Sequence, residues 1–164
     1  NWMKDVDKNS WYWAHWNNLY FSNALNGDIS HNVATFLLWK YECYLESGGK
    51  GGYRLTRYDK IEKPELEHIA PQTEPKIGGV EAGYCEYDEE FHNEYKNSLG
   101  NFLLLSKPHN GSASNRPFKD KRASYNYLAQ QRIIQQLTKD DLVWNKSKIE
   151  ERKNILKQFV LDTF

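Results

Sequence analysis

The chain has no net charge, few cysteines and no long apolar run, and each absence excludes a class of protein. Its 22 basic and 22 acidic residues balance, so any attraction for nucleic acid must come from a local patch or a bound cation. No apolar segment approaches the ~18 residues of a membrane span, and no signal-peptide pattern opens the chain. Cys43 and Cys85 form no CxxC motif, so neither a disulfide framework nor a zinc knuckle is indicated and we expect a cytoplasmic protein.

The chain is long enough for one domain, and it is rich in aromatic residues. Its 164 residues include six Trp and eleven Tyr, enough for a substantial core in a single domain. We expect helices over residues 1–50, an irregular central region over 51–124 and further helices over 125–164. The chain opens with Asn1 rather than Met, so we expect it to be part of a longer protein.

Helix signals flank the central region. Ser30 is a favourable N-cap, and Gly48 and Gly49 end the helix that follows it. A capping-box sequence, SKIE, begins at Ser147 and predicts the start of the last helix. Pro117 is tolerated in the first turn of another helix. The expected buried stripes are Val33, Phe36, Leu37, Tyr41 and Tyr44 in the earlier helix, and Ile149, Arg152, Leu156, Phe159 and Thr163 in the last.

Two short segments of the central region carry side chains suited to chemistry. Residues 66–72 read LEHIAPQ and residues 97–105 read NSLGNFLLL, and each contains an apolar strand candidate. Together with Asn110 they supply a carboxylate, an imidazole and two carboxamides. These are the groups that a phosphodiesterase with one metal ion requires.

His68 is the candidate proton acceptor and Glu67 the candidate metal ligand. A neutral imidazole at a strand end before Pro71 can take a proton from a water that attacks phosphorus, and a carboxylate suits Mg²⁺ or Mn²⁺. Adjacent residues on a regular strand point to opposite faces. The two side chains can therefore serve one phosphate only if the strand bends, bulges or ends between them. The structural alternatives are a histidine bonded to a backbone carbonyl and a solvent-facing glutamate.

The carboxamides and the basic residues complete the candidate site. Asn101, within an apolar run, needs hydrogen-bond partners, for which His68 or the loop that carries it are candidates. Asn110 lies in a turn-prone stretch and offers a second metal ligand, with His109 and Asn115 as substitutes. A structural turn is the alternative for both asparagines. Basic residues that suit phosphate contact, or else form a solvated surface, are Lys107, Arg116, Lys119, Lys121 and Arg122.

The ordered set of motifs resembles a known family. EHIxPQ, then NSLGNxxLL, then an Asn, then SNxxFxxKRxxY over residues 114–125, is similar to HNH (ββα-metal, or His-Me finger) nucleases. More narrowly, it resembles the C-terminal nuclease domain of GmrSD-like modification-dependent restriction proteins. Two flanking segments also resemble this domain: LLWKYE at residues 37–42, and IEER at residues 149–152, after Trp144. The resemblance implies an α+β fold, mainly helical, around a small ββα-metal core.

The resemblance also implies a role for each matching residue. His68 matches the general base, Asn101 the residue that orients it, and Glu67 and Asn110 the ligands of a divalent metal ion, Mg²⁺ or Mn²⁺. The implied activity is metal-dependent cleavage of DNA by the effector domain of a restriction, or anti-phage defence, protein. The family's N-terminal nucleotide-dependent domain is absent from this chain. The alternatives are an inactive HNH fold that binds nucleic acid and a helical interaction module.

Overall fold

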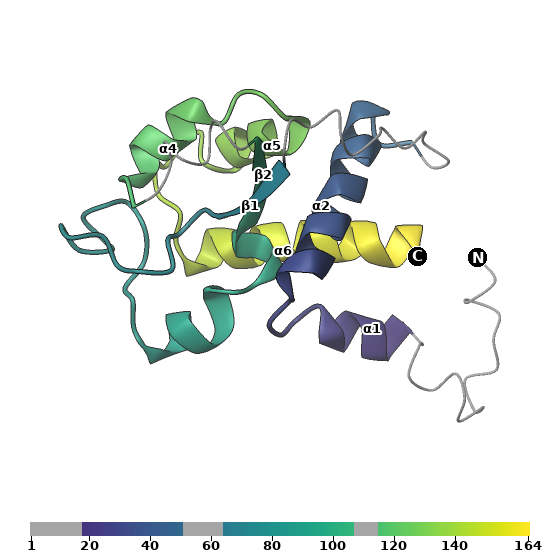
Figure 1. Ribbon diagram of the computed structural model, residues 1–164, viewed down its shortest axis with the longest axis horizontal. Helices are drawn as coiled ribbons and strands as arrows, with labels where there is room; N and C mark the ends of the chain where they lie inside the picture. Colours follow the sequence, from purple (N-terminus) through teal and green to yellow (C-terminus); the bar gives the residue numbers. More distant parts are fainter. Residues whose placement is uncertain (1–17, 51–63, 107–114) are drawn as a thin grey trace.

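The structure is a computed structural model that describes residues 18–50, 64–106 and 115–164 (Figure 1). Its elements are α1 (Asn18–Ala24), α2 (His31–Glu46), β1 (Pro64–His68), the π-helix η4 (Phe91–Tyr95), the 3-10 helix η5 (Leu99–Asn101), β2 (Phe102–Ser106), α4 (Phe118–Ser124), α5 (Ala129–Leu137) and α6 (Lys146–Thr163). The expected α+β class is confirmed, because helices surround one two-stranded antiparallel sheet. No helix in these described ranges is long and apolar enough to cross a membrane.

Helix α2 begins and ends where its sequence predicts. The side chain of Ser30 accepts a hydrogen bond from the backbone N–H of Val33, and Gly48 and Gly49 follow the helix with positive φ angles. The predicted buried stripe is partly wrong, because Val33 and Phe36 are exposed. The side chains that α2 buries are Ala34, Leu37, Leu38, Tyr41, Glu42 and Cys43.

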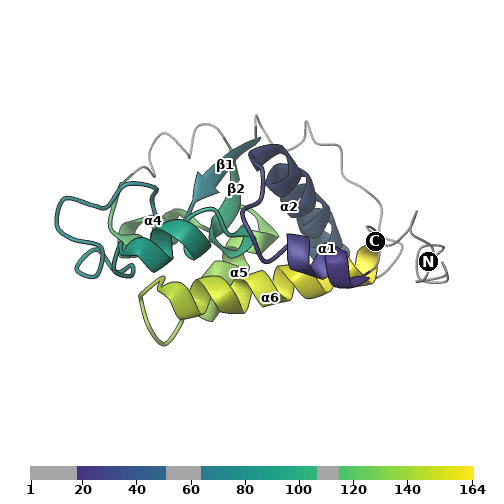
Figure 2. The ribbon, with the colours of Figure 1, turned by 90° about the horizontal axis from the view of Figure 1, so that it is seen from below.

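The sheet pairs the two predicted strand segments and separates two cores. Strands β1 and β2 are antiparallel, with Glu67 opposite Leu103 and His68 opposite Phe102. Alternate β2 side chains point to opposite faces. Phe102 and Leu104 therefore join the core formed with α2 and α6, whereas Leu103 joins the core that contains Phe118 and Trp144. Figures 1 and 2 show the sheet between α2 and the pair α4 and α5, with the long helix α6 running beside it.

Buried polar side chains attach α5 to the rest of the domain. The Glu42 carboxylate of α2 accepts hydrogen bonds from the backbone N–H groups of Ala129 and Gln130 at the start of α5. Those N–H groups have no partner within the helix. The side chains of Gln130 and Gln131 bond the backbone N–H and C=O of Leu104. Helix α5 thus satisfies backbone groups on the edge of β2.

Helix α6 fixes the turn that leads into β2. It begins two residues earlier than the capping box predicts, because the N-cap is Asn145 rather than Ser147 and accepts a hydrogen bond from Lys148 N at 3.0 Å. A Cβ atom at Gly100 would lie 2.0 Å from the carbonyl oxygen of Ile149, so only glycine permits this close approach. Arg152 donates hydrogen bonds to the carbonyls of Gly100 and Phe102. Phe102, which pairs with His68 at the end of β1, is therefore bonded to α6.

Candidate active site

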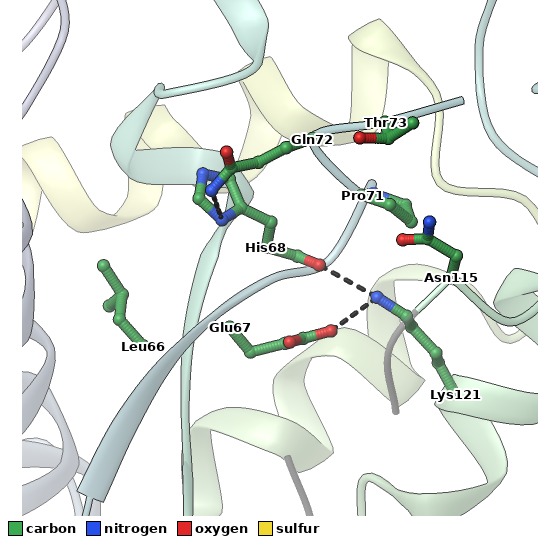
Figure 3. Close-up of a pocket in the computed structure, with 8 residues that line it drawn as sticks. All are labelled: Leu66, Glu67, His68, Pro71, Gln72, Thr73, Asn115 and Lys121. Atoms are coloured by element: carbon green, nitrogen blue, oxygen red, sulfur yellow. Dashed lines mark hydrogen bonds and ion pairs between the residues drawn. The ribbon is translucent and has the colours of Figure 1, made fainter. Parts of the chain in front are cut away.

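A pocket of about 300 Å³ lies at the end of β1 (Figure 3). Both terminal residues of that strand, Glu67 and His68, line it. Both residues belong to the strand, which ends at His68, and their ladder partners Leu103 and Phe102 lie in different cores. The strand therefore does not end between them, and their side chains leave opposite faces of β1. The complete lining is Leu66, Glu67, His68, Pro71, Gln72, Thr73, Asn115 and Lys121.

The imidazole of His68 is bonded through both nitrogens. Its Nε2 lies 3.3 Å from Oδ1 of Asn97, and its Nδ1 lies 3.1 Å from Nε2 of Gln72. The ring also packs edge-on against Phe102 and His31, with centroids 4.7 Å and 5.7 Å away. Burial lowers the pKa of His68 to about 4, and the hydrogen bond to Asn97 opposes this shift. His68 is therefore neutral near pH 7 and able to accept a proton.

Glu67 forms a buried ion pair with Lys121. The ammonium nitrogen of Lys121 lies 2.5 Å from Oε1 of Glu67, and it also donates to the carbonyls of His68 at 3.0 Å and Ile69 at 3.2 Å. Lys121 is only 2% exposed. Burial raises the pKa of Glu67 and lowers the pKa of Lys121, and their pairing opposes both shifts. Lys121, predicted as a DNA contact, thus bonds the end of β1 instead of extending into solvent.

Asn101 lies in η5, immediately before β2, and is fully buried. Its Oδ1 accepts from Ala70 N at 2.8 Å and from Trp144 Nε1 at 3.2 Å. Its Nδ2 donates to the carbonyls of Ala70 and Lys96, each at 3.0 Å. The amide therefore bonds the loop after His68, which was one of the two partners expected for it. The imidazole itself bonds Asn97 and Gln72.

The predicted basic residues divide into two groups. Arg116, just before α4, and Lys119, in the first turn of α4, are exposed. Arg122 is bonded within the domain, from Nε to Thr138 Oγ1 and from Nη2 to the carbonyl of Gln135. The predicted residues Lys107, His109 and Asn110 lie outside the described residues.

The pocket lining offers two oxygen donors of the kind that hard divalent cations bind. Glu67 offers a carboxylate and the exposed Asn115 a carboxamide oxygen, and magnesium is commonly bound through one or two carboxylates together with water and substrate phosphate. Within the described ranges there is no group of three or more His, Cys, Asp or Glu that could hold a metal ion. A cation here would compete with the Lys121 ammonium for Glu67.

Sequence reasoning assigned no role to two residues that contact His68. Asn97 and Gln72 both stand within the quoted motifs, at the start of NSLGN and the end of EHIxPQ. Asn97 lies 29 residues from His68 in the chain. A polar residue beside a predicted strand gives no indication of so distant a partner. Gln72, four residues after His68, could have been found by considering a bend at Pro71.

The pocket is thus lined by a buried, neutral histidine and a carboxylate. A family model for the C-terminal domain of GmrSD restriction endonucleases matches residues 16–159. The chain therefore belongs to this family, whose members are parts of DNA-cleaving restriction enzymes. A search of curated proteins finds no match to the chain.

Proposed function

We propose that this domain is a metal-dependent DNA endonuclease of the HNH type, with His68 as the general base. The observation that carries the proposal is that a neutral, buried imidazole and a carboxylate line the same pocket. The chain order of β1, β2 and α4, with residues of β1 and α4 in the pocket lining, supports a ββα-metal core. Family membership supports DNA as the substrate.

Glu67 and Asn110 are the proposed holders of a divalent cation, Mg²⁺ or Mn²⁺, and Asn115 offers a further oxygen beside Glu67. Such a cation, when bound, supplies positive charge that stabilises the scissile phosphate and the leaving 3′ oxygen.

The chain's own residues supply the remaining chemistry. His68 takes the proton of the attacking water, and burial keeps its imidazole neutral for that purpose. Asn101 holds the loop after His68 in place through its bonds to Ala70. Arg116 and Lys119 are exposed near Asn115 and grip flanking phosphates without reading sequence.

The proposed setting is the effector part of an anti-phage restriction protein. Family membership supports this role. An N-terminal nucleotide-dependent domain is the proposed partner, which would deliver DNA to the pocket and control cleavage.

Plasmid cleavage with and without Mg²⁺ or Mn²⁺ tests the proposal. Wild type should cut only with metal, and His68→Ala should lose on the order of 10²–10⁴-fold in rate, the usual contribution of a general base. His92→Ala is the matched control, because His92 is exposed on η4 and does not line the pocket. Circular dichroism of each variant checks that the fold is retained.

Two results would contradict the proposal. Cleavage by His68→Ala at the wild-type rate would remove His68 as the base. Salt-sensitive binding of DNA by wild type, with no cleavage in either metal, would favour the binding-only alternative.

A further inference from the structure

Asn97 contacts both the imidazole of His68 and the loop between α1 and α2. Its Oδ1 lies 3.3 Å from Nε2 of His68, and its Nδ2 donates to Oδ2 of Asp28 at 3.4 Å. The carbonyl of Asn97 also accepts from the backbone N–H of Ile29 at 3.4 Å. Two contacts therefore connect Asn97 to this loop, and its side-chain oxygen lies against the imidazole of His68.

Asp28 determines which way the Asn97 amide faces. A carboxylate only accepts hydrogen bonds, so the amide nitrogen of Asn97 must face Asp28. The amide oxygen, which also only accepts, then faces the imidazole. It follows that Nε2 of His68 carries the hydrogen and that Nδ1 carries the lone pair.

The contact of Gln72, on the opposite side of the ring, indicates the same tautomer. Its amide nitrogen lies 3.1 Å from Nδ1 of His68 and can donate only to a nitrogen that has no hydrogen (Figure 3). The contacts with Asn97 and Gln72 thus both select the tautomer with hydrogen on Nε2. The edge-on packing of Phe102 and His31 restrains the plane of the same ring.

We propose that Asn97, oriented by Asp28, is a positioning residue that fixes the Nε2–H tautomer of His68 and makes Nδ1 the proton-accepting atom. This inference rests on the proposed function of His68 as a base. A lone pair of the water oxygen forms the new bond to phosphorus while a proton of that water moves to the lone pair of Nδ1. The bond from phosphorus to the leaving oxygen breaks, and its electron pair stays on that oxygen. The resulting imidazolium still donates from Nε2 to Asn97.

This step requires Gln72 to leave Nδ1, because its amide occupies the lone pair that the proton must reach. Gln72 is exposed, so its side chain has room to turn toward solvent. Asn97 contacts the other nitrogen and can remain in place throughout.

The test is nuclear magnetic resonance of ¹⁵N-labelled histidine at neutral pH, without DNA or metal, with His68 assigned by comparison with His68→Ala. Wild type should show a protonated Nε2 and an unprotonated Nδ1. Asn97→Leu should give a mixture of both tautomers, together with a loss of about 10-fold in kcat, the factor of one such hydrogen bond, at nearly constant KM. Asn93→Leu is the matched control, since Asn93 is an exposed asparagine on η4.

Asp28→Asn provides a second variant should Asn97→Leu fail to fold. Asp28 is exposed, and its replacement by an amide lets the Asn97 side chain turn over, so a tautomer mixture is again expected. A wild-type His68 protonated at Nδ1, or an unchanged tautomer in both variants, would overturn the inference. The tautomer is read without cleavage. If the proposed function fails, the tautomer is still the expected one, but His68→Ala cleaves plasmid at the wild-type rate. This result differs from failure of the inference, in which the tautomer itself is wrong.

Discussion

Replacement of Asn101 by alanine should destabilise the domain by about 4 kcal/mol. The side chain is fully buried and makes four hydrogen bonds, two to Ala70 and one each to Lys96 and Trp144. Truncation leaves two buried donors, Ala70 N–H and Trp144 Nε1–H, without this acceptor, and each stranded donor costs about 1–3 kcal/mol. The backbone bond from Ile69 N to Asn101 O, at 2.9 Å, survives the substitution and limits the loss.

Urea denaturation followed by circular dichroism measures this loss as a change in the free energy of unfolding. About 4 kcal/mol is a large part of the 5–15 kcal/mol that stabilises a typical domain. Asn93→Ala, at an exposed site, should change stability by no more than about 0.5 kcal/mol. A loss below about 1 kcal/mol for Asn101→Ala would refute the reasoning, because the four bonds could not then be holding the loop after His68.

Two further predictions concern His68 and Gln72, the exposed residue that bonds it. Burial lowers the pKa of folded His68 to about 4 from the usual 6.5, so the unfolded chain takes up a proton first as pH falls, and stability is lost between pH 6.5 and 4. Wild type should therefore lose about 3 kcal/mol more than His68→Gln over this window. Equal losses in urea titrations at the two pH values would contradict this. Gln72→Ala should raise the cleavage rate roughly 2- to 10-fold, because a hydrogen bond worth about 0.5–1.5 kcal/mol no longer has to be broken before Nδ1 is available. A 10-fold slower variant in the same plasmid assay would mean instead that Gln72 positions the water.

The local features of the fold could be predicted from the sequence. Capping by Ser30 and the stripe of α6 follow from caps and helical spacing, which depend only on neighbours in the chain. Of the five residues predicted in that stripe, Thr163 is half-buried and the other four are buried, namely Ile149, Arg152, Leu156 and Phe159. The exposure of Val33 and Phe36 could not be predicted in this way. Which side of α2 is buried depends on where the sheet and α6 lie, and no local pattern contains that information.

In the candidate site, too, the residues marked by their local sequence could be predicted, whereas their distant partners could not. His68 and Glu67 stand out because of their motif and because Pro71 favours the end of a strand. Their partners come from distant parts of the chain: Lys121 is 54 residues from Glu67, and Asp28 is 69 residues from Asn97. A lysine in a basic stretch is ordinarily expected in solvent. Only the fold shows that Lys121 is buried against a carboxylate.

Lys121 and Arg122, both predicted as DNA contacts, are bonded within the domain. Lys121 ties α4 to the end of β1, and Arg122 ties it to the C-terminal part of α5 through Gln135 and Thr138. Both cations therefore hold α4 beside the pocket, and removing a partner of a buried ion pair is costly. In the described part of the predicted basic stretch, Arg116 and Lys119 remain exposed, and they are the residues that we propose to contact phosphate. The two exposed cations thus lie just before α4 and in its first turn, and the position of this helix depends on Lys121, the residue that pairs with Glu67.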